Sequence, residues 1–125
     1  MTENEVATET IDACYRVHTA LGPGLLESVY EAVLAFELGK RGLSVVSQRP
    51  LPVVYENVKL EVGFRIDLHV EDKVVVEVKS VEALADVHYK QVLTYLKLSD
   101  RKLGILVNFN VSSLKGHVRC IVNGL

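Results

Sequence analysis

Three ionisable side chains interrupt two strand-like segments that are otherwise largely apolar. Asp67 lies in the stretch GFRIDLH, and Glu77 and Lys79 lie in the stretch VVVEVK. Because side chains alternate between the two faces of a strand, Glu77 and Lys79 share one face of theirs. Arg65, Asp67 and His69 share one face of the other strand. Burying such charges without partners is costly, so a metal ion or a counter-charge is expected beside them.

Two carboxylates held close together favour a metal ion, because a divalent cation relieves their repulsion. Oxygen ligands favour Mg²⁺ or Mn²⁺ over zinc. The two cysteines, Cys14 and Cys120, cannot build a four-thiolate zinc or iron–sulfur site, and we expect both to be buried, reduced thiols. A lysine two residues beyond a carboxylate would lie beside the ion, where it can orient a water molecule or stabilise charge on a phosphate. These features predict metal-dependent chemistry on a phosphodiester.

The connection between the two strands decides whether the acids can meet. If segments 59–70 and 74–80 form an antiparallel hairpin, the numbers of any two paired residues add to the same total. Because side chains alternate between faces, Asp67 and Glu77 share a face only when that total is even. A two-residue turn would put them on opposite faces. We therefore predict a three-residue connection at 71–73, or else a bulge. The same alternation predicts that Ile66 and Leu68 lie together on the opposite face from Asp67.

The surrounding pattern predicts one domain over residues 1–125. A capping box at Thr2 and Glu5 begins a helix over 3–20. A second helix is expected from Pro23, in its first turn, to about Gly42. Apolar alternation then predicts strands at 43–48, 51–56, 59–70 and 74–80, a helix at 83–98, and strands at 102–108 and 117–122. The fold class is α/β (α+β), a mixed central sheet flanked by helices in the order α-α-β-β-β-β-α-β-β.

Composition restricts the class of protein. The chain is 49% hydrophobic and 24% charged, which is typical of a globular domain. It lacks an apolar run of ~20 residues and a basic-then-apolar leader, so we expect a cytoplasmic protein without a membrane segment. The net charge of −2 lacks the basic excess common in nucleic-acid-binding proteins. Five basic residues could form a local basic rim or a solvated surface: Lys97, Arg101, Lys102, Lys115 and Arg119.

The spacing Asp67…Glu77-x-Lys79 resembles that of the PD-(D/E)XK nuclease superfamily, which has a restriction-endonuclease-like core. Ile66 stands where the proline of that name would be. The stretch GLLESVY at 24–30 resembles the signature of the GxxExxY protein family, which is placed in the superfamily. The wider resemblance runs from about Val17 to about Asn110. Gln91 and Tyr95 match the QxxxY pattern of RecB-like members, and their spacing puts them on one helical face.

The resemblance implies a role for each matching residue. Metal ligands would be Asp67, Glu77, the backbone carbonyl of Val78 and, from the preceding helix, Glu27. Lys79 would act at the attacking water, and Gln91 and Tyr95 would contact the substrate backbone or Lys79. An acid in the first turn of a helix also gains stability from the helix dipole, so Glu27 has a second explanation. Tyr30 is more simply explained as a packed aromatic.

Two hypotheses follow for the function. The first is a Mg²⁺- or Mn²⁺-dependent nuclease that hydrolyses the phosphodiester bonds of DNA with a metal-activated water. In it, Arg65 is either a phosphate contact or a counter-charge for the acids. The second is a catalytically silent module of the same fold that binds nucleic acid or a protein partner. A homodimer would widen the binding surface of so small a core, although nothing in the sequence requires one.

Overall fold

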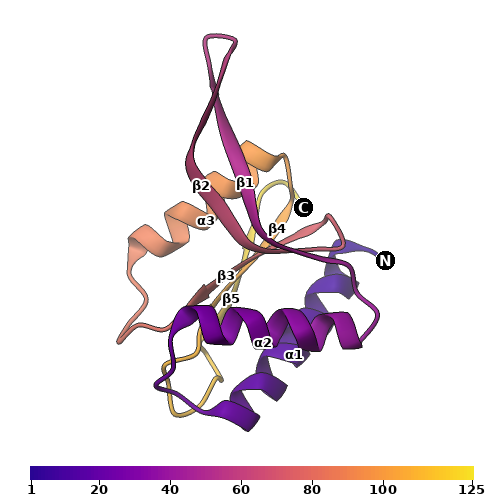
Figure 1. Cartoon of the computed structure of the whole chain (residues 1–125), viewed down its shortest axis with the longest axis vertical. Helices are drawn as coiled ribbons and strands as arrows, with labels where there is room; N and C mark the ends of the chain where they lie inside the picture. The colour runs from indigo at the N-terminus through magenta and orange to yellow at the C-terminus, as the bar shows by residue number, and fades with distance from the viewer.

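The computed structural model describes residues 1–125, the side chain of Val62 excepted. Three helices flank a five-stranded mixed sheet with the strand order β1-β2-β3-β4-β5 (Figure 1), which confirms the predicted fold class. The elements in chain order are α1 (Glu3–Leu21), α2 (Glu27–Lys40), β1 (Val45–Tyr55), β2 (Val58–Val70), β3 (Val74–Lys79), α3 (Asp86–Ser99), β4 (Leu103–Asn108) and β5 (Val118–Val122). No helix within the described residues is both long and apolar enough to span a bilayer.

The core has two parts, one on each face of the sheet. Helices α1 and α2 form one layer and pack on one face through residues such as Leu34, Leu68 and Val76. Helix α3 covers the other face, where Val75 and Leu96 belong to a smaller cluster. Strands β3 and β4 are buried almost throughout because both faces are covered. The charged residues of β3 are therefore held by a rigid central strand.

The predicted first helix is confirmed, including its capping box at Thr2 and Glu5. Placing Pro23 in the first turn of the second helix was wrong, because α2 begins at Glu27. The buried Tyr30 hydroxyl donates a hydrogen bond to the Gly22 carbonyl and accepts one from the Leu25 amide. These bonds hold the connection before α2 as an ordered loop, so the packed-aromatic interpretation of Tyr30 agrees with its position against Phe109.

The predicted strands 43–48 and 51–56 are one strand, β1, so the element order has one strand fewer before α3. Pro50 and Pro52 lie within β1 and cannot donate an N–H to a neighbouring strand. However, β1 is an edge strand, where a missing N–H donor is tolerated. The pairing with β2 shifts in register between Leu51 and Val53. Beyond this shift the two strands continue as a ribbon that projects from the rest of the molecule (Figure 1).

The hairpin between β2 and β3 has the predicted three-residue connection. Val70 pairs with Val74, and the last pair before the strands part is Leu68 with Val76. The prediction that Ile66 and Leu68 share a face was wrong. Leu68 packs in the core under α1 and α2, whereas Ile66 packs in the cluster under α3. Strand β2 therefore changes face near Asp67, where it leaves β3 and strict alternation ends.

The two cysteines differ in their surroundings. Cys14 is buried in α1, and this burial raises the pKa of its thiol to about 12. Cys120 is exposed on β5, contrary to the expectation that both thiols would be buried. The difference arises because β5 is the other edge strand of the sheet.

Candidate metal and nucleic-acid site

Asp67 and Glu77 meet at the point where β2 parts from β3. Asp67 Oδ2 accepts a hydrogen bond of 2.9 Å from the Val78 amide. Glu77 Oε1 accepts one of 3.2 Å from the Asp67 amide. The two carboxylates thus bond to backbone amides just beyond the last residue pair of the hairpin. The separation of the strands places both carboxylates in one small region of the sheet.

The carboxylates of Asp67 and Glu77 have little positive charge near them. Glu77 is 3% exposed, and its burial, together with the charge of Asp67, raises the pKa of Glu77 to about 8. Burial also raises the pKa of Asp67. Lys79 opposes both shifts through its positive charge but does not cancel them. At neutral pH the pair is thus held in a state that an added cation would stabilise.

Glu27 lies at the start of α2, near the end of β3. Its Oε2 accepts a hydrogen bond of 3.2 Å from the Ser80 amide, and Ser80 Oγ donates to the Leu25 carbonyl at 2.6 Å. These bonds tie α2 to the segment that follows Lys79. Among the described residues, no three or more His, Cys, Asp or Glu side chains are grouped closely enough to hold a metal ion. The structure therefore does not bring Glu27 into one compact group with Asp67 and Glu77.

Two further residues belong to this region and were missed from the sequence. Gln48 Nε2 donates to both carboxylate oxygens of Glu31, at 2.8 and 3.0 Å, and to Asp67 Oδ1 at 3.4 Å. Burial raises the pKa of Glu31, with smaller contributions from the charges of Asp67 and Glu27. Glu31 could have been found from its position one helical turn after Glu27. Gln48 carried no such signal, because its backbone takes the left-handed region within β1, with φ 53°.

Lys79, Gln91 and Tyr95 line a groove of about 550 Å³ between β3 and α3. The pKa of the Tyr95 hydroxyl is raised by burial and by the negative charges of Glu77 and Asp67. Tyr95 is therefore within electrostatic range of the acid pair. The structure therefore brings the two α3 residues of the predicted site to the same region as Lys79.

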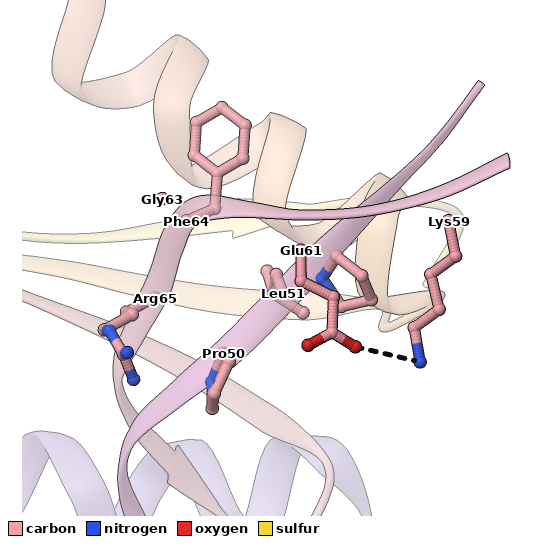
Figure 2. A pocket seen from close by; sticks show the side chains of 8 residues that line it. Pro50, Leu51, Lys59, Glu61, Gly63, Phe64 and Arg65 are labelled. Atoms are coloured by element: carbon pink, nitrogen blue, oxygen red, sulfur yellow. Dashed lines mark ion pairs between the residues drawn. The ribbon is translucent and has the colours of Figure 1, made fainter.

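Arg65 is exposed and lies on the side of β2 away from Phe64 (Figure 2). Its Nη1 donates to the Gln48 carbonyl at 3.3 Å, and it also lines a pocket of about 360 Å³ at the base of the projecting ribbon. No ion pair among the described residues joins Arg65 to Asp67 or Glu77. Its contact with the site is thus indirect, through the backbone of Gln48.

Comparison with known proteins identifies the family. Residues 4–121 match the PD-(D/E)XK nuclease superfamily, and the chain belongs to it. No curated protein and no solved structure matches the chain. Membership indicates a metal-dependent nuclease that binds nucleic acid, since nucleases of this superfamily generally use divalent metal ions.

The residues present fit a divalent cation. Asp67 and Glu77 supply hard oxygen donors, and burial raises the pKa of both carboxyls despite the positive charge of Lys79. The Gln48 amide lies between Asp67 and Glu31, where it provides partial positive charge to both. A cation would provide the same compensation more strongly than an amide does.

Proposed function

We propose that the chain is a Mg²⁺- or Mn²⁺-dependent nuclease that hydrolyses phosphodiester bonds of DNA. The observation that carries the proposal is the pair of half-buried Asp67 and buried Glu77, which has raised pKa values and feels the positive charge of Lys79. Buried carboxylates with too little counter-charge are costly to stability, and such groups are concentrated at functional sites. DNA as the substrate, a cytoplasmic location and a homodimer are parts of this proposal.

Asp67, Glu77 and the backbone carbonyl of Val78 would hold the ion. When bound, the ion supplies Lewis-acid chemistry by polarising a phosphate oxygen and lowering the pKa of a coordinated water. Lys79 lies on β3 two residues after Glu77, so it can orient the attacking water and place positive charge near the phosphate. Val78 keeps its amide bonded to Asp67, which fixes the orientation of that carboxylate.

The third carboxylate would come from α2. Glu27 matches the GxxExxY signature and is bonded to the Ser80 amide. Glu31 is already joined to Asp67 through Gln48. Comparing Glu27→Gln with Glu31→Gln in Mn²⁺ titrations identifies the contributor as the variant with the larger loss of affinity. We assign Glu27 this role on the motif, and equal affinity of Glu27→Gln and wild type would overturn the assignment.

The substrate would lie over Gln91 and Tyr95 on α3, which correspond to a RecB-like QxxxY pattern. Tyr95 stays within electrostatic influence of both acids. Arg65 is proposed as a phosphate contact, since it is exposed and makes no described ion pair with the acids. We place the chain in the GxxExxY group of the superfamily on the stretch Gly24–Tyr30.

The direct test is cleavage of plasmid and single-stranded DNA with Mn²⁺, Mg²⁺ or EDTA. Wild type should cleave only with metal, and Lys79→Ala should be at least about a hundredfold slower. Lys73→Ala is the matched control, since Lys73 lies in the β2–β3 connection and bonds to the Met1 carbonyl. Equal cleavage by wild type and Lys79→Ala, or none by wild type with either metal, would contradict the proposal.

A silent nuclease-fold module is the second candidate. One observation favours it: the net charge of −2 lacks the basic excess that phosphate binding usually brings. Titration with Mn²⁺ separates the candidates. Micromolar to low-millimolar binding that Asp67→Asn abolishes supports the enzyme, and the absence of binding supports the module.

A further inference from the structure

The groove beside Lys79 has an aromatic wall that is partly open to solvent. Phe64 and Tyr95 both line it, with their ring centroids 5.8 Å apart in an edge-to-face arrangement. Phe64 is 38% exposed, and Figure 2 shows its ring standing clear of the β2 backbone. The Tyr95 ring thus fixes the position of Phe64 while part of the Phe64 ring remains available to a planar ligand.

Cations accompany this aromatic wall. Lys79 and Lys90 also line the groove. Lys90, Thr94 and Lys97 are exposed and are spaced four and three residues apart, so they share one face of α3. None of the ion pairs among the described residues uses Lys79, Lys90 or Lys97. These lysines are therefore available to phosphates.

We propose that this groove binds single-stranded DNA, with one base stacked on Phe64 and the backbone following Lys90 and Lys97. Aromatic rings beside cations are the combination that binds unpaired strands, because an unpaired base exposes its face. A duplex hides its base faces and is held mainly through phosphates, for which a chain of net charge −2 has no cation excess. The inference rests on the proposed function, since Lys79, Gln91 and Tyr95 of the proposed site line the groove.

The first test measures binding by fluorescence anisotropy in EDTA, where no cleavage occurs. The probes are labelled oligothymidylate, a duplex of the same length and an abasic strand of the same length. Phe64→Ala should weaken oligothymidylate binding at least about fivefold, from a stacking free energy of ~1–3 kcal/mol per base. It should leave abasic-strand binding unchanged. Phe36→Ala is the matched control, because Phe36 lies on α2 and is 71% exposed.

A second variant keeps the test valid if Phe64→Ala fails to fold. The chain contains no tryptophan, so Phe64→Trp introduces a single indole with a large stacking surface. Oligothymidylate should quench its fluorescence, and the abasic strand should not. Phe36→Trp should show no quenching. Lys90→Ala should make the slope of log association constant against log salt concentration shallower by about 0.7, which is the effect of one lost phosphate contact. Lys40→Ala should leave this slope unchanged.

Some results would overturn the inference. These are tighter binding of the duplex than of oligothymidylate, wild-type binding by Phe64→Ala, or quenching of Phe64→Trp by the abasic strand. The proposed function fails separately. If metal-dependent cleavage were absent but base stacking on Phe64 were observed, the proposed nuclease function would be contradicted and the strand-binding groove would stand. If duplex DNA were cleaved but no base stacked on Phe64, only the strand-binding groove would be contradicted.

Discussion

At the turn of the β2–β3 hairpin, Asp72 is held between two arginines, whereas at the open end Asp67 and Glu77 face each other with one lysine nearby. Asp72 Oδ1 accepts hydrogen bonds from Arg49 Nη1 at 2.8 Å and from Arg101 Nη2 at 2.9 Å. These two bonds lower the pKa of Asp72 to about 2. The protein itself supplies the counter-charge at the turn.

The open end shows the opposite balance. Burial and the charge of Asp67 raise the pKa of Glu77 to about 8, although Lys79 is close. The same hairpin thus carries one acid that is paired with two arginines and one acid pair that has only a lysine nearby. Since stability alone would favour the arrangement at the turn, the difference supports our proposal that the open end binds a cation from outside the chain.

The largest expected effect is on cleavage. Glu77→Gln should lower metal-dependent DNA cleavage at least about a hundredfold, because it removes a charged ligand for the ion. Asp72→Asn should leave the rate near that of wild type, because Asp72 acts at the turn. Initial rates on plasmid DNA at saturating Mn²⁺ provide the measurement. Equal losses in both variants would mean that the two ends of the hairpin do not differ in function.

The next effect is on stability at alkaline pH. The folded-state pKa of Glu77 lies above its unfolded value of 4.5, so the folded state binds the proton more tightly. The stability contributed by this proton is present below pH 4.5 and is lost as pH rises to about 8. Glu77→Gln should therefore have a higher melting temperature than wild type above pH 8. The difference should be ~3–6 °C for each kcal/mol of unfolding free energy that wild type loses when Glu77 ionises.

This pH prediction has a matched control. Thermal melts in EDTA across the same pH range should show no such gain for Asp72→Asn. If the melting temperatures of wild type and Glu77→Gln differed by the same amount at every pH from acid to alkaline, the raised pKa of Glu77 would be contradicted.

A smaller effect is expected from Asp72 in acid. Its folded-state pKa of about 2 lies below the unfolded value of 3.8, so its stabilisation is present above pH 3.8 and is lost as pH falls to about 2. Because the Asp72 side chain is 66% exposed, the two ion pairs should contribute no more than ~1 kcal/mol. Urea melts of Asp72→Asn and wild type should converge at the acid end, and a gap that widens there would contradict this assignment.

The smallest effect concerns Gln48. Gln48→Ala should lower the free energy of unfolding in EDTA by ~0.5–1.5 kcal/mol, because the hydrogen bonds to Glu31 and Asp67 are lost. Saturating Mn²⁺ should reduce this difference, since the ion compensates the same carboxylates. Paired urea melts with and without Mn²⁺ measure it. A difference that is unchanged by the metal would mean that the amide and the ion act at separate places.

Local rules were enough to predict part of this structure from the sequence. The Thr2–Glu5 capping box follows from residue type and spacing. The three-residue connection follows from the alternation of side chains along paired strands, because an odd number of connecting residues is needed if Asp67 and Glu77 are to share a face. Both features depend on a few neighbouring residues. They required no knowledge of how distant segments pack.

Features that depend on distant packing were missed. Gln48 reaches Asp67 because its backbone takes the left-handed region, with φ 53°, in the strand that passes Glu31. The predicted strands 43–48 and 51–56 form one edge strand, β1, and nothing in the local pattern identifies an edge strand. The change of face near Asp67 likewise arises only when β2 leaves β3 and turns towards α3.

Isothermal titration of the metal-free protein with Mn²⁺ tests the central claim most directly. Wild type and Asp72→Asn should bind with micromolar to low-millimolar affinity, and Asp67→Asn should give no binding heat. Equal binding by wild type and Asp67→Asn, or no binding by wild type, would contradict the proposal that the open end of the hairpin holds a divalent cation.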